Sequence, residues 1–168
     1  MNILELKRPI WFMRQAGRHL PEYRKIRAKK KNFLDFCFDK KSIVEATLQP
    51  VQRYKIDCAI IFCDILIAPY ILGQKISFVK GEGPLLENLS LEELISLKPL
   101  PQKKKDLQNT YDAIKDIRKK LNKNKCLIGF CGGPWTVACY MINGKGDTKF
   151  KSAIEKISKE KLLLVKLL

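Results

Sequence analysis

The sequence predicts an α/β fold in which short parallel strands are covered by helices on both faces. Two apolar runs, 58–63 and 126–131, show none of the polar alternation that marks a strand with one face in water. Segments with helical spacing of apolar residues lie between these runs, and such an alternation of strand and helix is typical of βα units. At 168 residues, 46% of them hydrophobic, the chain is long enough for one domain with a sizeable core.

In chain order, the first predicted strand is the short apolar stretch 10–13. A helix is predicted over 41–55, with Ser42 as a possible N-cap because its hydroxyl can accept from the first helical N–H groups. The apolar stripe of that helix comprises Ile43, Ala46, Thr47, Val51 and Tyr54. The next strand is the run 58–63, since a segment this short and this apolar is typical of a strand buried on both faces.

Between 74 and 101 the pattern changes. The alternation of polar and apolar residues over 75–79, followed by the turn residues 81–84, predicts a short hairpin or loop decoration. Ser90 then starts a brief helix, with Glu93 placed to complete a capping box. Prolines at positions 99 and 101 are expected to end that helix.

A second long helix is predicted over 106–122, with its apolar side chains at Leu107, Tyr111, Ile114, Ile117 and Leu121. The run 126–131 follows as the last strand, and the residues Gly132-Gly133-Pro134 after it allow a tight turn. The tail over 148–168 has a helical pattern that becomes entirely apolar and basic towards its end.

The composition is strongly basic, because 33 Lys and Arg residues against 17 Asp and Glu give a net charge of +16. Such a surplus suggests a polyanionic partner, for example a nucleic acid, a membrane surface or a multiply carboxylated substrate. Basic residues gather at 27–31, 103–105 and 119–125, where an ordinary solvated surface is the alternative. These clusters lack interleaved aromatic residues for base stacking, which weakens the nucleic-acid interpretation.

The N-terminus shows no secretory signal pattern, and the longest apolar stretch, 58–73, is too short to span a bilayer. We therefore expect a cytoplasmic protein without a membrane partner. Its six cysteines would stay reduced in that compartment, and they form no C-x-x-C pair of the kind that zinc sites use. Most lie in apolar runs, which favours buried structural thiols over a metal or redox role.

In parallel βα architectures, functional groups come from the C-terminal ends of strands and the loops that follow. The first candidate is therefore the loop 14–18, in which Arg14 and Arg18 lie four residues apart and Gly17 lets a ligand approach the backbone. Two guanidiniums can hold carboxylates bidentately, although a pair of surface arginines is the alternative.

The other candidates follow the two long apolar runs. Asp64 ends the first run, where burial makes an unpaired charge costly, so it needs either an arginine partner or a cationic or N–H-rich ligand. The stretch 132–136 follows the second run. Tyr140 lies close enough along the chain for its hydroxyl to reach the same site at the strand ends. Considered alone, Tyr140 is better explained as a core residue than as a site residue.

Five segments of the chain together resemble the uroporphyrinogen decarboxylase family. The longest, 10–24, reads I-W-F-M-R-Q-A-G-R-H-L-P-E-Y-R and is similar to the N-terminal signature of that family. The others are 47–50, 60–66, 81–84 and 129–136. The similarity stays in register from about residue 5 to about residue 152, so a chance match is improbable.

This resemblance implies part of a (β/α)8 barrel, because a complete one needs roughly 200 residues at the least. We expect residues 1–168 to form a single incomplete barrel domain, corresponding to the family's N-terminal half, with an atypical tail over 153–168. The family decarboxylates the four acetate side chains of uroporphyrinogen III to give coproporphyrinogen III in porphyrin and haem biosynthesis. It works as a cytoplasmic homodimer without metal or organic cofactor, and no nucleic-acid partner is implied.

The resemblance also implies roles for particular residues. Arg14 and Arg18 match carboxylate-binding arginines, Asp64 matches an aspartate that faces the pyrrole N–H groups, and Tyr140 matches an active-site tyrosine. The implied catalytic residues are Asp64, Arg14 and Arg18. The implied substrate-binding residues are Arg14, Gln15, Ala16, Gly17, Arg18, Asp64 and Tyr140.

Some positions depart from the family pattern. His19 stands where the family usually has Tyr or Phe, so we interpret it as a packing residue. The family also draws a serine and a histidine from later strands, which predicts little activity for these 168 residues alone. Two other function classes stay open: a basic, non-enzymatic nucleic-acid-binding protein, and a methyltransferase of the related barrels. The second needs a Cys and His metal set, of which Cys63 and Cys131 are present without a matching histidine.

Overall fold

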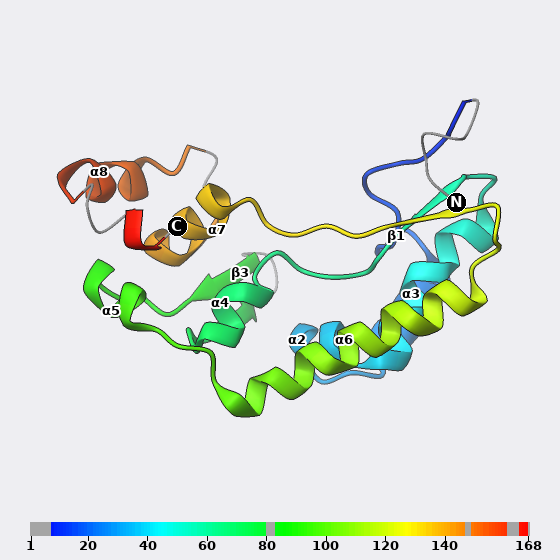
Figure 1. Cartoon of the computed structure of the whole chain (residues 1–168), viewed down its shortest axis with the longest axis horizontal. Coiled ribbons are helices and arrows are strands. Elements are labelled where there is room, and N and C mark those ends of the chain that lie inside the picture. The colour runs from blue at the N-terminus through cyan, green and yellow to red at the C-terminus, as the bar shows by residue number, and fades with distance from the viewer. Residues whose placement is uncertain (1–7, 80–82, 147–148, 161–164, 168) are drawn as a thin grey trace. The chain divides into compact units, whose positions relative to one another are not determined.

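The computed structural model describes residues 8–79, 83–146, 149–160 and 165–167, which fold as two compact units (Figure 1). Unit 1 takes the described residues up to Cys63 together with Lys105–Phe130. Unit 2 takes Asp64–Lys104 together with the described residues from Cys131 onward. Both contain helices and strands, so the α/β class is confirmed.

Unit 1 is built on a parallel pair of strands. β1 (Cys58–Ile60) pairs with β4 (Cys126–Ile128), with Cys58 opposite Cys126. Both predicted parallel strands are therefore confirmed, but each is shorter than its apolar run. Beyond β1 the chain continues without regular structure, and the Phe62 N–H donates to the Thr47 hydroxyl at 2.9 Å.

Two long helices pack on this strand pair. α3 (Lys40–Arg53) and α6 (Pro101–Lys120) lie side by side in Figure 1. Together with β1 they enclose a core of Ile43, Val44, Leu48, Val51, Ile56, Ala59, Ile61, Ala113, Ile117 and Leu121. Burying this apolar surface is the main favourable contribution to the stability of the unit.

The start of α3 differs from the prediction. Its N-cap is Asp39, whose carboxylate accepts from the Ser42 backbone N–H at 2.9 Å and from the Ser42 hydroxyl at 2.7 Å. Ser42 is thus a hydrogen-bond donor inside the first turn and not the cap. Tyr54, expected on the buried stripe, follows the last helical residue and is exposed.

The buried face of α6 also differs from the predicted stripe. Tyr111 and Ile114 are 54% and 38% exposed, whereas Ala113 and Ile117 are fully buried. The smaller alanine faces the core, so the stripe is displaced relative to the one that bulky side chains predict. The helix also begins at Pro101, which the sequence predicted as part of the end of the preceding helix. Proline suits the first helical position because no N–H is needed there.

The strand predicted over 10–13 is wrong: the segment is irregular, and its four apolar side chains are 40–80% exposed. Within this segment, Ile10 is bonded to Asp57, the residue before β1. The Ile10 carbonyl accepts from the Asp57 N–H, and the Ile10 N–H donates to the Asp57 carboxylate, both at 2.8 Å. Beyond that point the edge of β1 is occupied by the Gln15 side chain, so no backbone ladder can form.

Two helices that the sequence reading did not anticipate complete unit 1. α1 (Pro21–Ala28) and α2 (Phe33–Phe38) pack on α3 through a cluster of aromatic and aliphatic side chains. In this cluster the rings of Tyr23, Phe36 and Phe62 meet edge to face with centroids 4.9–5.7 Å apart. The segment after β1 is thereby fixed against the N-terminal helices.

Unit 2 contains the predicted hairpin, which is confirmed. β2 (Ile76–Val79) and β3 (Gly83–Leu86) pair antiparallel. Of the turn expected over 81–84, residues 81 and 82 lie outside the described residues, while 83 and 84 belong to β3. α5 (Leu91–Ser96) follows and carries the predicted capping box between Ser90 and Glu93.

The remaining helices of unit 2 are α4 (Ile67–Leu72), α7 (Pro134–Asn143) and α8 (Lys151–Lys159). α4 ends at Gly73, whose φ of 105° requires glycine. α8 confirms a helix within the tail, although residues 161–164 and 168 lie outside the described residues. Across the described residues, no helix has the length and apolar character needed to cross a membrane.

The cysteine prediction is largely confirmed. No disulfide joins the six thiols, and four of them, Cys37, Cys58, Cys126 and Cys139, are buried. Cys131 is exposed and Cys63 is intermediate. Burial raises the pKa of the Cys58 and Cys139 thiols, as expected of buried structural cysteines.

Candidate functional site

A pocket of about 380 Å³ lies in unit 1 at the C-terminal ends of β1 and β4. Its lining comes from the loop 13–17 with His19, from the segment 60–63, and from Phe130. The segment 60–63 and Phe130 lie at or just after the C-terminal ends of β1 and β4, and the loop 13–17 lies beside these ends. This is the location at which parallel βα architectures place functional groups.

The loop 14–17 is attached to β1 through Gln15. The Gln15 amide donates from Nε2 to the carbonyl oxygen of Cys58 at 2.8 Å, and its Oε1 accepts from the Ile60 N–H at 3.0 Å. Gln15 is 6% exposed, whereas Arg14 before it is exposed and lines the pocket. The loop therefore alternates an inward amide with an outward guanidinium.

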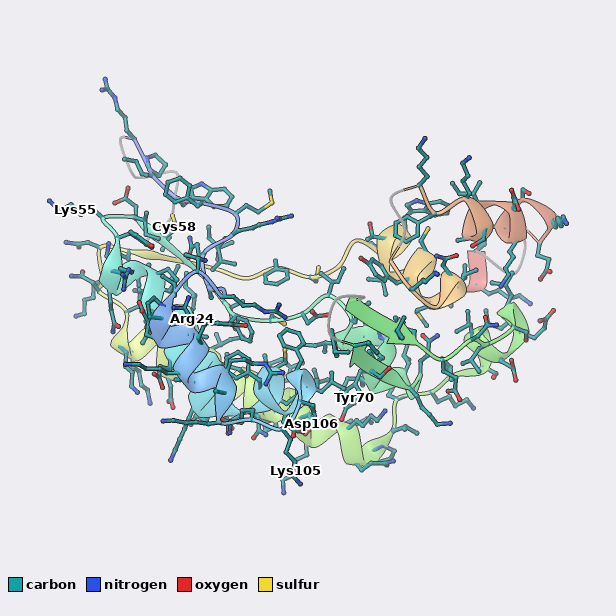
Figure 2. The ribbon with its side chains drawn as sticks, turned by 180° about the vertical axis from the view of Figure 1, so that it is seen from behind. Arg24, Lys55, Cys58, Tyr70, Lys105 and Asp106 are labelled. Carbon is teal, nitrogen blue, oxygen red and sulfur yellow. The ribbon has the colours of Figure 1, made fainter. Side chains whose placement is uncertain are left out.

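Arg14 is the only side chain with a permanent charge among the residues that line this pocket. Arg18 is exposed, and it does not belong to that lining. Its backbone is held instead by Arg24, labelled in Figure 2, whose Nη1 donates to the Arg18 carbonyl oxygen at 2.7 Å. The structure thus brings one of the two predicted arginines into the pocket.

Gly17 lets the loop pass beneath His19. A Cβ atom at position 17 would lie 3.3 Å from Nδ1 of His19, tighter than an ordinary contact. The His19 ring is exposed and lines the pocket, so it is more than the packing residue that the sequence suggested.

Asp64 is the first residue of unit 2, and it accepts hydrogen bonds from the residues at the start of α4. Its Oδ1 accepts from the Leu66 N–H at 2.8 Å, and its carbonyl oxygen accepts from Ile67 at 3.4 Å. Burial raises the pKa of this carboxyl group, and the hydrogen bond from Leu66 opposes that rise. A half-buried carboxylate at the end of the apolar run is therefore observed, as the sequence predicted.

Tyr140 lies on α7, also in unit 2. It is half-buried, packs at the edge of the hydrophobic core, and meets the Phe150 ring with centroids 5.4 Å apart. A Cβ atom at position 146 would lie 3.0 Å from the Tyr140 hydroxyl, so Gly146 leaves room for it. Asp64 and Tyr140 thus belong to unit 2, whereas the loop 14–18 belongs to unit 1.

The residues after β4 are shaped by space rather than by unusual dihedral angles. A Cβ atom on Gly132 would collide with Cγ2 of Val137 and lie 3.1 Å from Cβ of Ile65. Gly133 has φ −61° and acts as the N-cap residue of α7, which Pro134 opens. Close packing therefore explains Gly132 better than the tight turn that the sequence suggested.

Thr47, which the sequence placed on an apolar stripe and in the family-like segment 47–50, supports a wall of the pocket. Its hydroxyl donates to the carbonyl oxygen of Ile43 at 2.7 Å and accepts from the N–H of Phe62 at 2.9 Å. Phe62 lines the pocket, so Thr47 fixes one pocket wall from behind. A hydroxyl on an otherwise apolar buried face was the available signal for this role.

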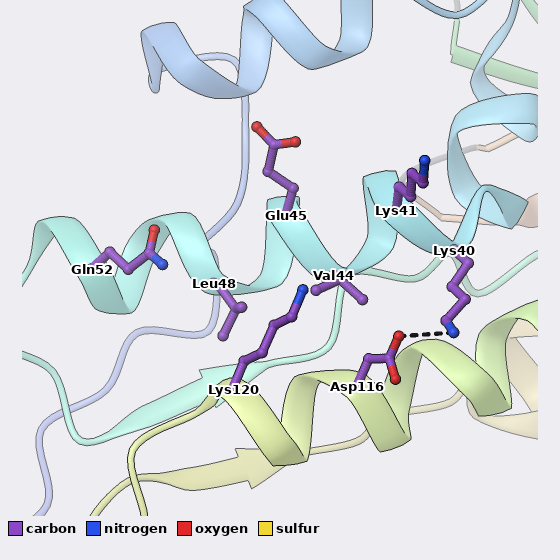
Figure 3. A pocket seen from close by; sticks show the side chains of 8 residues that line it. All are labelled: Lys40, Lys41, Val44, Glu45, Leu48, Gln52, Asp116 and Lys120. Atoms are coloured by element: carbon purple, nitrogen blue, oxygen red, sulfur yellow. Dashed lines mark ion pairs between the residues drawn. The ribbon is translucent and has the colours of Figure 1, made fainter.

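A second hollow of about 520 Å³ lies between α3 and α6 of unit 1 (Figure 3). Lys40, Lys41 and Lys120 surround it, and Lys40 pairs with Asp116 at 2.8 Å. The paired side chains are 42% and 34% exposed, so solvent screens their attraction. This hollow fits the solvated basic surface that the sequence offered as the alternative for its lysine clusters.

The part of the chain that the structure describes holds no group of three or more His, Cys, Asp or Glu side chains arranged to bind a metal ion. Among residues at the strand ends, Cys63 lines the first pocket and Cys131 is exposed in unit 2.

Comparison with known proteins gives consistent results. A family model described as uroporphyrinogen decarboxylase matches residues 6–168. Uroporphyrinogen decarboxylase from Rickettsia felis is 48% identical over 163 residues, covering 96% of this chain and 46% of that protein. The protein of the same name from Rickettsia canadensis is 46% identical, covering 96% of this chain and 48% of its own length. The chain thus spans about half the length of the curated relatives it matches.

A solved structure is also similar. A methyltransferase from Methanosarcina mazei superposes with a TM-score of 0.60 over 81% of this chain and 40% of that protein. The sequence identity is 17%, so this likeness concerns the fold alone.

Proposed function

The chain belongs to the uroporphyrinogen decarboxylase family, and from this membership we propose that it serves the decarboxylation of uroporphyrinogen III to coproporphyrinogen III. The domain proposed for residues 1–168 is part of a (β/α)8 barrel that includes both units. The nucleic-acid alternative is not favoured, because the family match covers nearly the whole chain.

The observation that carries the proposal is the position of Arg14 in the strand-end pocket of unit 1. The substrate carries eight carboxylates, four on acetate and four on propionate side chains. A guanidinium offers a planar pair of donors that matches a carboxylate, and no acidic side chain lines the pocket to compete for it. The net charge of +16 would also speed the encounter with such a polyanion.

Each decarboxylation breaks the bond between an acetate methylene and its carboxyl carbon, releasing carbon dioxide. The electron pair of that bond needs an acceptor, which protonation of a pyrrole carbon provides by making the ring cationic. The methylene then takes up a proton to become a methyl group while the ring loses the proton it had gained. One proton is consumed overall for each carbon dioxide released.

Asp64 is proposed to stabilise this cationic ring from its N–H side. A fixed carboxylate that is already largely removed from water interacts more strongly with a developing positive charge than a solvated one. Burial raises the pKa of Asp64. A cationic ring close to the carboxylate would favour the ionised form and lower that pKa again. Arg14 and Arg18 are proposed to orient carboxylates of the substrate, and Tyr140 to complete its binding site.

The same proposal covers location and assembly. Six thiols without a disulfide suit the reducing cytosol, where we place the protein, and we expect the homodimer that the family resemblance implies.

The test is a chimera that joins this chain to the part of the Rickettsia felis protein outside the match. We expect it to convert uroporphyrinogen III to products with fewer carboxylates, measured by chromatography of the oxidised porphyrins. The 168-residue chain alone should release little carbon dioxide, because the matched relatives are about twice as long.

The matched variants are Arg14→Ala and Arg53→Ala. Both remove an exposed arginine of unit 1, but Arg53 lies on α3 and pairs with Glu22 at 3.1 Å. Turnover should fall strongly with the first and hardly with the second. A folded chimera without turnover, or equal effects of the two variants, would overturn the proposal.

A further inference from the structure

Gln15 has an unusual place among the residues beside the pocket. The side chains around it are exposed or half-buried, yet the Gln15 amide is 94% buried beneath the loop. Both ends of this amide are engaged by backbone atoms of β1, at 2.8 Å from the Cys58 oxygen and 3.0 Å from the Ile60 nitrogen. Gln15 is among the residues that line the pocket, but both polar ends of its amide are already engaged by the backbone of β1.

The two bonded atoms lie on the edge of β1 that β4 leaves unpaired. β4 is bonded to the other edge, through the carbonyl oxygen of Asp57 and the N–H of Ile61. In a parallel ladder, one residue offers its groups to one neighbour and the next residue to the other. Cys58 and Ile60 consequently present a carbonyl and an N–H that require a partner of their own.

A glutamine amide is well suited to replace that partner strand. It contains one carbonyl oxygen and one NH2 group, so it can accept and donate at once as a peptide group does. Glutamate could accept from Ile60 but, when ionised, could not donate to Cys58. The side chain of Gln15 therefore continues the sheet by one position while its backbone remains in the loop.

We propose that Gln15 is a positioning residue: it ties the loop to β1, sets Arg14 at the pocket, and makes no contact with the substrate's carboxylates. The proposal rests on the function proposed above only for the identity of the ligand. The far end of the loop is tied separately, by Arg24 to the Arg18 carbonyl and by the Leu20 N–H to the Gly17 carbonyl at 3.0 Å. Losing Gln15 would therefore free the end that carries Arg14.

The first test needs no ligand. Gln15→Met keeps the length of the side chain but removes both hydrogen bonds, and Gln52→Met makes the same exchange at an exposed position of α3. Amide hydrogen exchange should accelerate by about tenfold or more at Ile60 in the first variant. The Ile61 amide, bonded to β4, should stay protected, and Gln52→Met should change neither. Unchanged protection at Ile60 would overturn the proposal.

Should Gln15→Met fail to fold, Gln15→Asn decides the question. Asparagine keeps the amide but is one methylene shorter, so it cannot reach both backbone partners from the same loop position. Faster exchange at Ile60 with retained protection at Ile61 supports the proposal that Gln15 ties the loop to β1. Wild-type protection at Ile60 refutes it.

The second test measures binding of uroporphyrin III, the stable oxidised octacarboxylate, to the full 168-residue chain by fluorescence titration. Arg14→Ala and Gln15→Met are each expected to weaken binding by about tenfold, and the double variant no further than Arg14→Ala alone. A positioning role predicts this non-additivity, because Gln15 acts only through Arg14. Losses that multiply in the double variant would show a direct contact and sink the proposal.

The two tests separate the inference from the function it builds on. If the wild-type chain does not bind uroporphyrin III, the proposed ligand is wrong, while exchange at Ile60 still decides whether Gln15 clamps the loop. If binding is normal and Ile60 is unprotected in the wild type, the ligand stands and the clamp fails.

Discussion

Replacing Thr47 with valine should weaken unit 1 without changing the shape of its core. Thr47 is fully buried on α3, and its hydroxyl links Ile43 to the Phe62 N–H, at the wall of the strand-end pocket. Valine has nearly the same volume and shape, so the packing is kept while the hydroxyl is lost. The substitution therefore isolates the contribution of the two hydrogen bonds.

The size of the effect follows from which partner is left unsatisfied. The Ile43 carbonyl keeps its helical hydrogen bond within α3, so it loses little. The Phe62 N–H donates to the Thr47 hydroxyl, and leaving a buried donor unsatisfied costs about 1–3 kcal/mol. Because Phe62 is half-buried, we expect the lower part of that range, about 1–2 kcal/mol of unfolding free energy.

Urea unfolding followed by Trp11 fluorescence, in a Trp135→Phe background, measures unit 1 because Trp135 lies in unit 2. Amide exchange at Phe62 identifies the cause. Thr47→Ser is the control: it loses about one buried methyl group's worth of stability, roughly 1 kcal/mol, but keeps Phe62 protected. The reasoning is refuted if Thr47→Val is as stable as the wild type and its Phe62 amide is still protected.

Three further predictions concern single residues of either unit. Because burial raises the pKa of Asp64, its proton adds stability that is complete below its unfolded pKa and lost as pH rises through its folded one. Asp64→Asn should thus gain stability over wild type as the pH rises above the unfolded pKa of about 4, measured by urea unfolding, while turnover of the chimera falls; a pH-independent difference contradicts this. Gly132→Ala should lower the melting temperature because its Cβ would collide with Val137, whereas Gly133→Ala, whose Cβ would make only an ordinary contact with Oγ1 of Thr136 at 3.9 Å, should not; equal shifts would show that packing is not the reason. Asp39→Ala should cost about 1 kcal/mol in urea unfolding through loss of the α3 cap, and Asp39→Asn, which keeps a capping oxygen, should cost much less; similar losses would argue against capping.

The sheet of unit 1 shows how far local patterns carry a prediction. The runs 58–63 and 126–131 identified both strands and their parallel direction, because continuous apolarity reflects burial on both faces. The equally apolar stretch 10–13 is no strand, since a strand also needs a partner with free N–H and carbonyl groups. Whether such a partner is available depends on β1, which is more than 40 positions away in the sequence and whose free edge is bonded to the Gln15 side chain.

The candidate site was predicted in part for the same reason. The rule that function follows strand ends located Arg14 and Asp64, and both are found directly beyond or beside such an end. The roles of Gln15 and Thr47 were not predictable from local pattern. Gln15 bonds to residues 43 and 45 positions away, and the Thr47 hydroxyl bonds to a residue 15 positions away.

The sequence by itself determined the α/β class, the family and the basic composition, because these depend on composition, periodicity and ordered motifs. The tertiary structure decided which side chains serve the pocket and which hold it together. Arg14 lines the pocket while Gln15, its immediate neighbour, is buried in the edge of β1. The different roles of these two neighbours depend on hydrogen-bond partners in β1 that only folding brings close to the loop. A local sequence pattern therefore cannot predict them.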